Sequence, residues 1–170
     1  MVPVISLIIP WGILWLGLWL EPAPPEPVYT YGEFPFELQY EMDGNIKTIK
    51  DVIICEYKGI EINEASGKYR KWESRILSNN SNRITLFQVS GSEEIYYNPG
   101  PPGFYMGDYN NEYNYDFPNA RFIKYNEYNS GYQDGVISAE ELYSKYKIKL
   151  LKWEVASPIQ NSFKQTNKFF

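Results

Sequence analysis

Residues 34–42 read FPFELQYEM, and apolar and polar side chains alternate along this stretch. Successive side chains of a β-strand point to opposite faces of a sheet, so the alternation predicts a strand with one buried face and one wet face. The buried face would carry Phe34, Phe36, Leu38, Tyr40 and Met42. This stretch therefore indicates a sheet protein with a hydrophobic core on one side of the strand.

The next residues predict a hairpin. Asp43-Gly44 is a dipeptide typical of two-residue turns, and it leads into a second expected strand over residues 46–57. The centre of that strand, residues 52–55 (VIIC), is apolar on both faces and belongs in a sheet interior. We expect Cys55, the only cysteine, to be a small buried hydrophobe, since no cation adjacent in sequence lowers its pKa.

The remaining elements are also short and mostly extended. Turn-forming residues 78–82 (SNNSN) separate two of the expected strands. The expected strands cover residues 68–77, 83–90, 94–98, 120–125 and 148–155, the last with Leu151, Trp153 and Val155 on one face. The sequence thus predicts a mainly β, antiparallel, sandwich-like domain, with one short helix over residues 139–147.

An apolar run precedes this domain. Residues 2–20 contain no ionisable side chain and would span about 28 Å as a helix, close to the thickness of a bilayer core. We expect residues 1–20 to be a single transmembrane anchor rather than a cleaved signal peptide, because no A-x-A-like site follows them. With acidic residues after the run, we expect the C-terminal part to be extracytoplasmic.

The rest of the chain divides into three further parts. Residues 21–33 begin with EPAPPEP and predict a proline-rich stalk, which would hold the domain about 20 Å from the membrane. Residues 34–156 would form the β-rich extracytoplasmic domain, which is enough chain for one hydrophobic core. Residues 157–170 are polar apart from their last phenylalanines, and we expect them to be loosely ordered.

Composition excludes several classes of function. The formal net charge is −5, so the chain lacks the excess of positive charge that binding to nucleic acid requires. Basic and aromatic residues alternate in residues 68–77, and we expect these to form a solvated strand face. There is no histidine, which removes Ser-His-Asp and Cys-His catalysis and the commonest metal ligand.

Tyrosines crowd the region from residue 105 to residue 132. Tyrosine offers a large rigid contact area with a hydrogen-bonding tip, so the segment is a candidate binding surface. The other interpretation is a long loop that folds onto the sheet, with residues 120–125 as a strand. The candidate binding residues are Tyr105, Tyr109, Tyr113, Tyr115, Tyr125, Tyr128 and Tyr132.

Acidic residues between the tyrosines raise two alternatives. Paired carboxylates can hydrolyse glycans, and the candidates for such a pair are Asp108, Glu112, Asp116 and Glu127. Residues 130–142 (SGYQDGVISAEEL) partly match a calcium loop, with candidate ligands Asp134, Ser138 and Glu141.

Helix capping explains the same residues better than calcium. Ser130 and Tyr132 stand where the loop needs oxygen-rich ligands. Asp134-Gly135 predicts a turn, and Ser138 with Glu141 forms a capping box that opens the helix. We therefore expect no cofactor, with calcium as the alternative.

Three stretches carry a resemblance to known proteins. They are residues 31–44 (YGEFPFELQYEMDG), 67–76 (GKYRKWESRI) and 137–154 (ISAEELYSKYKIKLLKWE). Together they resemble uncharacterised membrane-anchored extracytoplasmic proteins of low-GC Gram-positive bacteria, which implies an envelope-facing β domain. The expected function is a non-enzymatic binding or structural module of the cell envelope, anchored by its N-terminal helix, with an envelope protein or glycan as partner.

Overall fold

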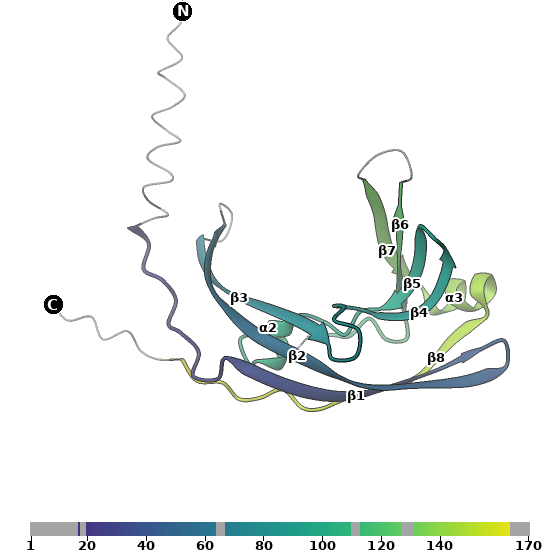
Figure 1. Ribbon diagram of the computed structural model, residues 1–170, viewed down its shortest axis with the longest axis horizontal. Helices are drawn as coiled ribbons and strands as arrows, with labels where there is room; N and C mark the ends of the chain where they lie inside the picture. The colour runs from purple at the N-terminus through teal and green to yellow at the C-terminus, as the bar shows by residue number, and fades with distance from the viewer. Residues whose placement is uncertain (1–16, 18–19, 64–66, 110–112, 127–130, 164–170) are drawn as a thin grey trace, which may run out of the picture.

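The computed structural model describes residues 17, 20–63, 67–109, 113–126 and 131–163, which form two antiparallel sheets (Figure 1). The first sheet has the order β3-β2-β1-β8 and the second the order β4-β5-β6-β7. The first sheet contains β1 (Tyr31–Met42), β2 (Asn45–Asn63), β3 (Gly67–Ile76) and β8 (Ile148–Val155). The second contains β4 (Ile84–Ser90), β5 (Glu93–Tyr97), β6 (Ala120–Tyr125) and β7 (Tyr132–Ile137). The fold is therefore mainly β and sandwich-like, as predicted.

The hairpin of β1 and β2 confirms the expected turn. Met42 pairs with Asn45, which leaves Asp43 and Gly44 as the two turn residues. Their φ angles are 51° and 76°, and positive values at both positions are what a tight hairpin turn of this kind requires. The turn fixes the register, so Phe34 lies opposite Ile53 on the same face of the sheet.

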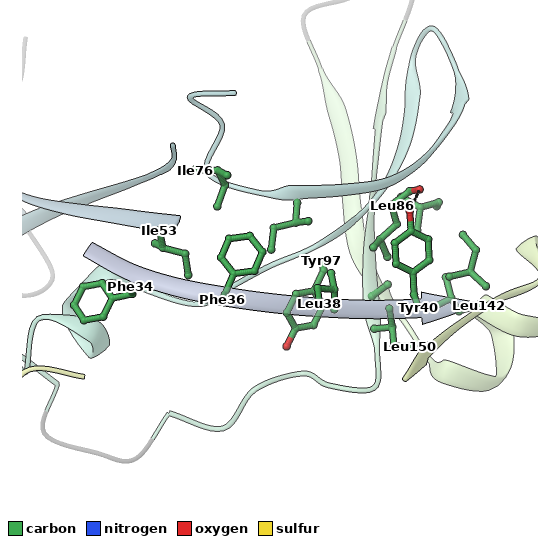
Figure 2. Close-up of a cluster of buried hydrophobic side chains, with 14 of the residues drawn as sticks. Phe34, Phe36, Leu38, Tyr40, Ile53, Ile76, Leu86, Tyr97, Leu142 and Leu150 are labelled. Atoms are coloured by element: carbon green, nitrogen blue, oxygen red, sulfur yellow. Dashed lines mark hydrogen bonds between the residues drawn. The ribbon is translucent and has the colours of Figure 1, made fainter. Parts of the chain in front are cut away.

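That face of β1 forms the centre of the hydrophobic core (Figure 2). Phe34, Phe36, Leu38 and Tyr40 are all at most 5% exposed, as the alternation predicted. The Tyr40 hydroxyl donates a hydrogen bond to the backbone carbonyl of Leu86 in β4, at 3.2 Å. One strand of the first sheet is thereby joined to the second sheet both by apolar packing and by a buried hydrogen bond.

The described residues contain two short helices, where the sequence predicted one. The expected helix is α3 (Ala139–Tyr146), and the residue that follows it, Lys147, caps its C-terminal end with a left-handed backbone. The second is α2 (Pro102–Tyr105), which lies in a proline-glycine stretch that indicated only the end of a strand. Pro102 occupies the first helical position, where its missing N–H and restricted φ are tolerated. Through α2, Tyr105 reaches the core and packs against Phe34, with ring centroids 5.1 Å apart.

The prediction for the faces of β8 was wrong at Leu151. Tyr40 pairs with Leu150 and Gln39 pairs with Lys152, so Leu151 is an extra residue in a β-bulge. A bulge moves the residues beyond it to the other phase of the strand. Leu150 and Trp153 consequently share the core side, while Leu151 is 37% exposed.

The segments at both ends of the domain are attached to it. Glu21 lies beside Lys68 of β3, whose ammonium donates to the Glu21 carbonyl at 2.6 Å, and Arg70 donates to the Pro25 carbonyl at 3.2 Å. The proline-rich segment thus runs along β3 instead of standing away from the domain as a free stalk.

The described part of the C-terminal segment pairs with the N-terminal one. The Asn161 side chain exchanges two hydrogen bonds with the Tyr29 backbone, at 3.0 and 2.9 Å, and Pro27 bridges to Phe163. These contacts hold residues up to Phe163, where the sequence predicted loose order.

The expected transmembrane anchor falls on residues 1–20, most of which lie outside the described residues. None of the helices in the described ranges has the length and apolar character that crossing a bilayer requires.

Ion pairs cover the face of the first sheet that points away from the core. Glu37 of β1 accepts from Lys50 of β2 at 2.7 Å and from Lys152 of β8 at 3.1 Å. These two ammonium groups, Lys50 first, lower the pKa of Glu37 from 4.5 to about 2. A carboxylate whose pKa is lowered by folding stabilises the protein above its unfolded pKa, and that stabilisation is lost as the pH falls towards 2.

We therefore predict that Glu37→Gln lowers the melting temperature at neutral pH, because Lys50 loses its carboxylate and Lys152 keeps only Glu154 as a partner. The difference from the wild type should shrink between about pH 5 and about pH 2, where Glu37 itself becomes protonated. Melting curves monitored by circular dichroism across this pH range test the prediction. Glu41→Gln is the matched control, since Glu41 lies on the same face of β1 and is not among the ion-paired carboxylates of the described residues. A pH-independent difference would contradict the prediction.

Candidate functional site

A hollow lies on the face of the second sheet that points away from the core. Its volume is about 320 Å³, at the lower end of the range for small-molecule sites. Two shifts of register bend β4 against β5, and both strands curve in Figure 1. We call this site the tyrosine hollow, and its lining consists of Asn82, Arg83, Tyr96, Asn98, Ile123, Tyr125, Tyr132 and Asp134.

The strand pairing explains why these side chains gather there. Tyr125 pairs with Tyr132, and the next position on the same face is occupied by Ile123, which pairs with Asp134. Residues that are two apart on a strand share a face, so β6 and β7 supply one wall of the hollow. In β5, Tyr97 is in the core and its neighbour Tyr96 points to the opposite face, where it lines the hollow.

Two tyrosine rings at the edge of the hollow are open to solvent. Tyr125 is 46% and Tyr132 is 60% exposed. Their ring centroids lie 6.2 Å apart with the planes inclined by 53°, so the rings do not stack on each other. Exposed neighbouring aromatic rings beside a hollow are a typical arrangement for contact with a ligand.

A buried carboxylate fixes the arginine of the hollow. Glu94 is only 9% exposed and accepts from Thr85 at 2.5 Å and from Arg83 at 2.9 Å. The Arg83 guanidinium also lies over the Tyr96 ring, 5.2 Å from its centroid, and donates weakly to the Tyr125 hydroxyl at 3.4 Å. These partners hold Arg83 in one position, which pre-organises this side of the hollow.

The structure places the seven candidate tyrosines in different environments. Tyr125 and Tyr132 belong to the tyrosine hollow, and Tyr128 lies outside the described residues. Tyr105 is fully buried, donates a hydrogen bond to the Pro99 carbonyl and cannot meet a ligand at the surface.

The remaining tyrosines do not extend the hollow. Tyr113 and Tyr115 pack against Phe104 of α2, with ring centroids at 5.7 and 5.8 Å, whereas Tyr109 is half-exposed. The described part of the 105–132 segment is thus a loop folded onto the core, followed by β6 and the start of β7.

The two candidate catalytic carboxylates that are described bind different arginines. Asp108 accepts from Arg70 Nε and from Trp72 Nε1, both at 2.7 Å, and Arg70 makes a second contact with its other oxygen. Asp116 instead pairs with Arg121 at 3.5 Å. Both carboxylates are therefore engaged by arginines, each in its own contact. Glu112 and Glu127 lie outside the described residues.

The candidate calcium ligands lie on separate elements. Asp134 is in the middle of β7 and pairs with Arg121 at 3.4 Å, so the predicted turn at Asp134-Gly135 was wrong. A glycine is needed at position 135 for another reason. A Cβ there would clash with the Phe122 ring, which lies across the strand and would be 2.8 Å away.

The capping interpretation is confirmed at the start of α3. The Ser138 hydroxyl accepts from the backbone N–H of Glu141 at 3.2 Å. Among the described residues, no group of three His, Cys, Asp or Glu side chains could hold a metal ion.

Basic residues of β3 are paired rather than free. Lys71 binds Glu61 at 2.6 Å, and Arg75 lies 3.7 Å from Glu56. On the core side of β2, Cys55 is fully buried and burial raises the pKa of its thiol to about 12. The thiol is thus a packing group, as expected.

Sequence reasoning missed most of the hollow. Arg83, Asn82 and Asn98 stand at the ends of strands, where turn-forming residues are common. The adjacent pair Tyr96-Tyr97 did contain a signal, because neighbouring residues of a strand point to opposite faces and only one of them can enter the core.

No protein-family model, curated protein or solved structure matches this chain.

Asp108 supports a prediction about stability. Its contact with Arg70 joins the loop after α2 to β3, and the same guanidinium contacts the Pro25 carbonyl and lies 4.2 Å from the centroid of the Phe163 ring. We predict that Asp108→Asn lowers the free energy of unfolding by about 2 kcal/mol, because a largely buried arginine loses its carboxylate. Urea unfolding of the full chain in detergent, followed by tryptophan fluorescence, measures this.

Lys71→Met is the matched control, because it breaks an exposed ion pair on the opposite face of β3 and should have a smaller effect. Equal effects of the two substitutions would show that the Arg70–Asp108 contact does not hold these segments together.

Proposed function

We propose that this protein is a non-enzymatic binding module of a bacterial cell envelope, and that the tyrosine hollow is its ligand site. The observation that carries the proposal is the pair Tyr125 and Tyr132, exposed side by side at the edge of a hollow with a largely polar lining. Tyrosine and arginine are enriched among the residues that dominate binding energies at interfaces.

The surroundings of the hollow favour binding over catalysis. Arg83 and Asp134 are each held by an oppositely charged partner, at 2.9 and 3.4 Å. A general acid or base must be able to exchange a proton with a substrate, and side chains that are neutralised within the protein are less suited to that. They are well suited to hold tyrosine rings and amides in fixed positions.

The envelope location rests on residues 2–20, which have the length and composition of a membrane anchor. In this proposal the anchor crosses the membrane once and the β domain faces outwards. Glu21 contacts β3, which lies towards the opposite end of the molecule from the second sheet (Figure 1). The hollow would thus remain accessible to a protein or glycan of the envelope when the N-terminus is in the membrane.

A cosedimentation experiment tests the proposal. The full chain, kept in detergent, is mixed with membrane-free cell walls of the bacterium that produces it, and the bound fraction is measured. If the wild type binds through the hollow, the double substitution Tyr125→Ala and Tyr132→Ala should weaken binding at least about tenfold, which corresponds to a loss of about 1.4 kcal/mol.

Tyr143→Ala is the matched control. Tyr143 is 53% exposed on α3 and does not line the hollow, so this variant should bind like the wild type. The proposal is wrong if the wild type does not bind, or if the double variant binds as well as the wild type.

A further inference from the structure

The charges around the tyrosine hollow compensate one another. Arg83 pairs with Glu94, and Arg121 pairs with Asp134 and with Asp116. The charged lining residues Arg83 and Asp134 and their direct partners Glu94 and Arg121 therefore carry two positive and two negative charges. An anionic ligand would have to displace a carboxylate that is already bound to an arginine, and such a replacement gains little. The hollow is suited to a ligand without net charge.

The two exposed tyrosine rings do not stack on each other, so neither ring covers the face of the other. Because the planes of Tyr125 and Tyr132 are inclined by 53°, a ring of the ligand can lie against one tyrosine while the other tyrosine borders it at the side. The face of an aromatic ring is electronegative, and it attracts the weakly positive C–H groups on the apolar face of a sugar ring. Two inclined tyrosines thus match a rigid, non-aromatic ring with C–H groups on one side.

The polar groups of the hollow both donate and accept hydrogen bonds. A side-chain amide carries both functions, and so does a tyrosine hydroxyl. The side chain of Asn98 is held in place, because its amide oxygen Oδ1 accepts a hydrogen bond from the backbone N–H of Gly100 at 3.0 Å. Its NH₂ group and the amide of Asn82 can then meet hydroxyl groups, which also donate and accept. This combination fits a ligand with many hydroxyls.

We propose that the tyrosine hollow binds neutral carbohydrate, with one sugar ring lying against Tyr125 or Tyr132 and its hydroxyls bonded to Asn82 and Asn98. This inference rests on the proposed function and names the class of ligand for the same site. It requires that affinity depends on the aromatic rings and hardly on salt, because no net charge is neutralised on binding.

Calorimetric titration of the full chain tests the inference. The protein is kept in a detergent without a sugar head group, since such a head group would compete for the hollow. The probes are neutral oligosaccharides, namely hexamers of glucose, mannose and N-acetylglucosamine, beside two polyanions, polygalacturonate and poly(glycerol phosphate). We expect at least one neutral hexamer to bind, with less than a threefold change in affinity between about 50 and about 500 mM salt.

Variants of one residue separate the ring from its hydroxyl. Tyr132→Ala should weaken binding of that hexamer tenfold or more, whereas Tyr132→Phe keeps the ring and should weaken it less than threefold. Tyr143→Ala on α3 should have no effect. Equal losses for Tyr132→Ala and Tyr132→Phe would contradict the role of the ring face.

The remaining outcomes distinguish this inference from the proposed function. Binding of the polyanions alone, with strong salt dependence, overturns the neutral ligand and leaves the hollow as a binding site. If no oligosaccharide binds but cell walls still do through Tyr125 and Tyr132, the ligand is not a neutral carbohydrate and the proposed function stands. If the walls do not bind either, both are wrong.

Discussion

The buried face of β1 is the constraint on which the rest of the structure depends. At one end of the strand, Phe34 packs against Tyr105 of α2. At the other end, Tyr40 lies in one core cluster with Leu86 of the second sheet and Leu142 of α3 (Figure 2). Because side chains alternate strictly along a strand, a shift of one residue would turn this whole set towards solvent. The Asp43-Gly44 turn prevents that shift on the side of β2.

A single core between the sheets leaves two outer faces with different properties. The outer face of the first sheet carries ion pairs such as those of Glu37. This carboxylate is paired with lysines on the two neighbouring strands of the same sheet. The outer face of the second sheet is hollowed and contains Tyr125 and Tyr132 beside a fixed Arg83. Hollows are also lined by residues of the first sheet, but only the hollow of the second sheet contains two exposed tyrosine rings among the described residues, which makes it the better place for a ligand. The proposed division between a scaffold face and a binding face follows from this difference.

Local patterns in the sequence predicted the elements whose structure is determined locally. Alternation identified β1, the Asp43-Gly44 pair identified its turn, and Ser138 identified the start of α3. The failures have long-range causes. Gly135 was predicted as a turn residue, but a glycine is needed there because the Phe122 ring of the neighbouring strand lies across it. Leu151 was predicted to be in the core, but a bulge in the pairing with β1 turns it outwards, and the sequence of β8 alone does not show that bulge. For the same reason only two of the six candidate tyrosines that the structure describes lie at the hollow, since tertiary packing decides that Tyr105 is buried.

Native-state hydrogen exchange tests most directly whether the two sheets share one core. If they do, the amides of β1 and of β5 should exchange only through global unfolding, with the same free energy of opening and the same dependence on denaturant. The tyrosine hollow is then a rigid part of the folded protein. Exchange of β5 and β6 through a separate opening of clearly lower free energy, while β1 stays protected, would contradict this account.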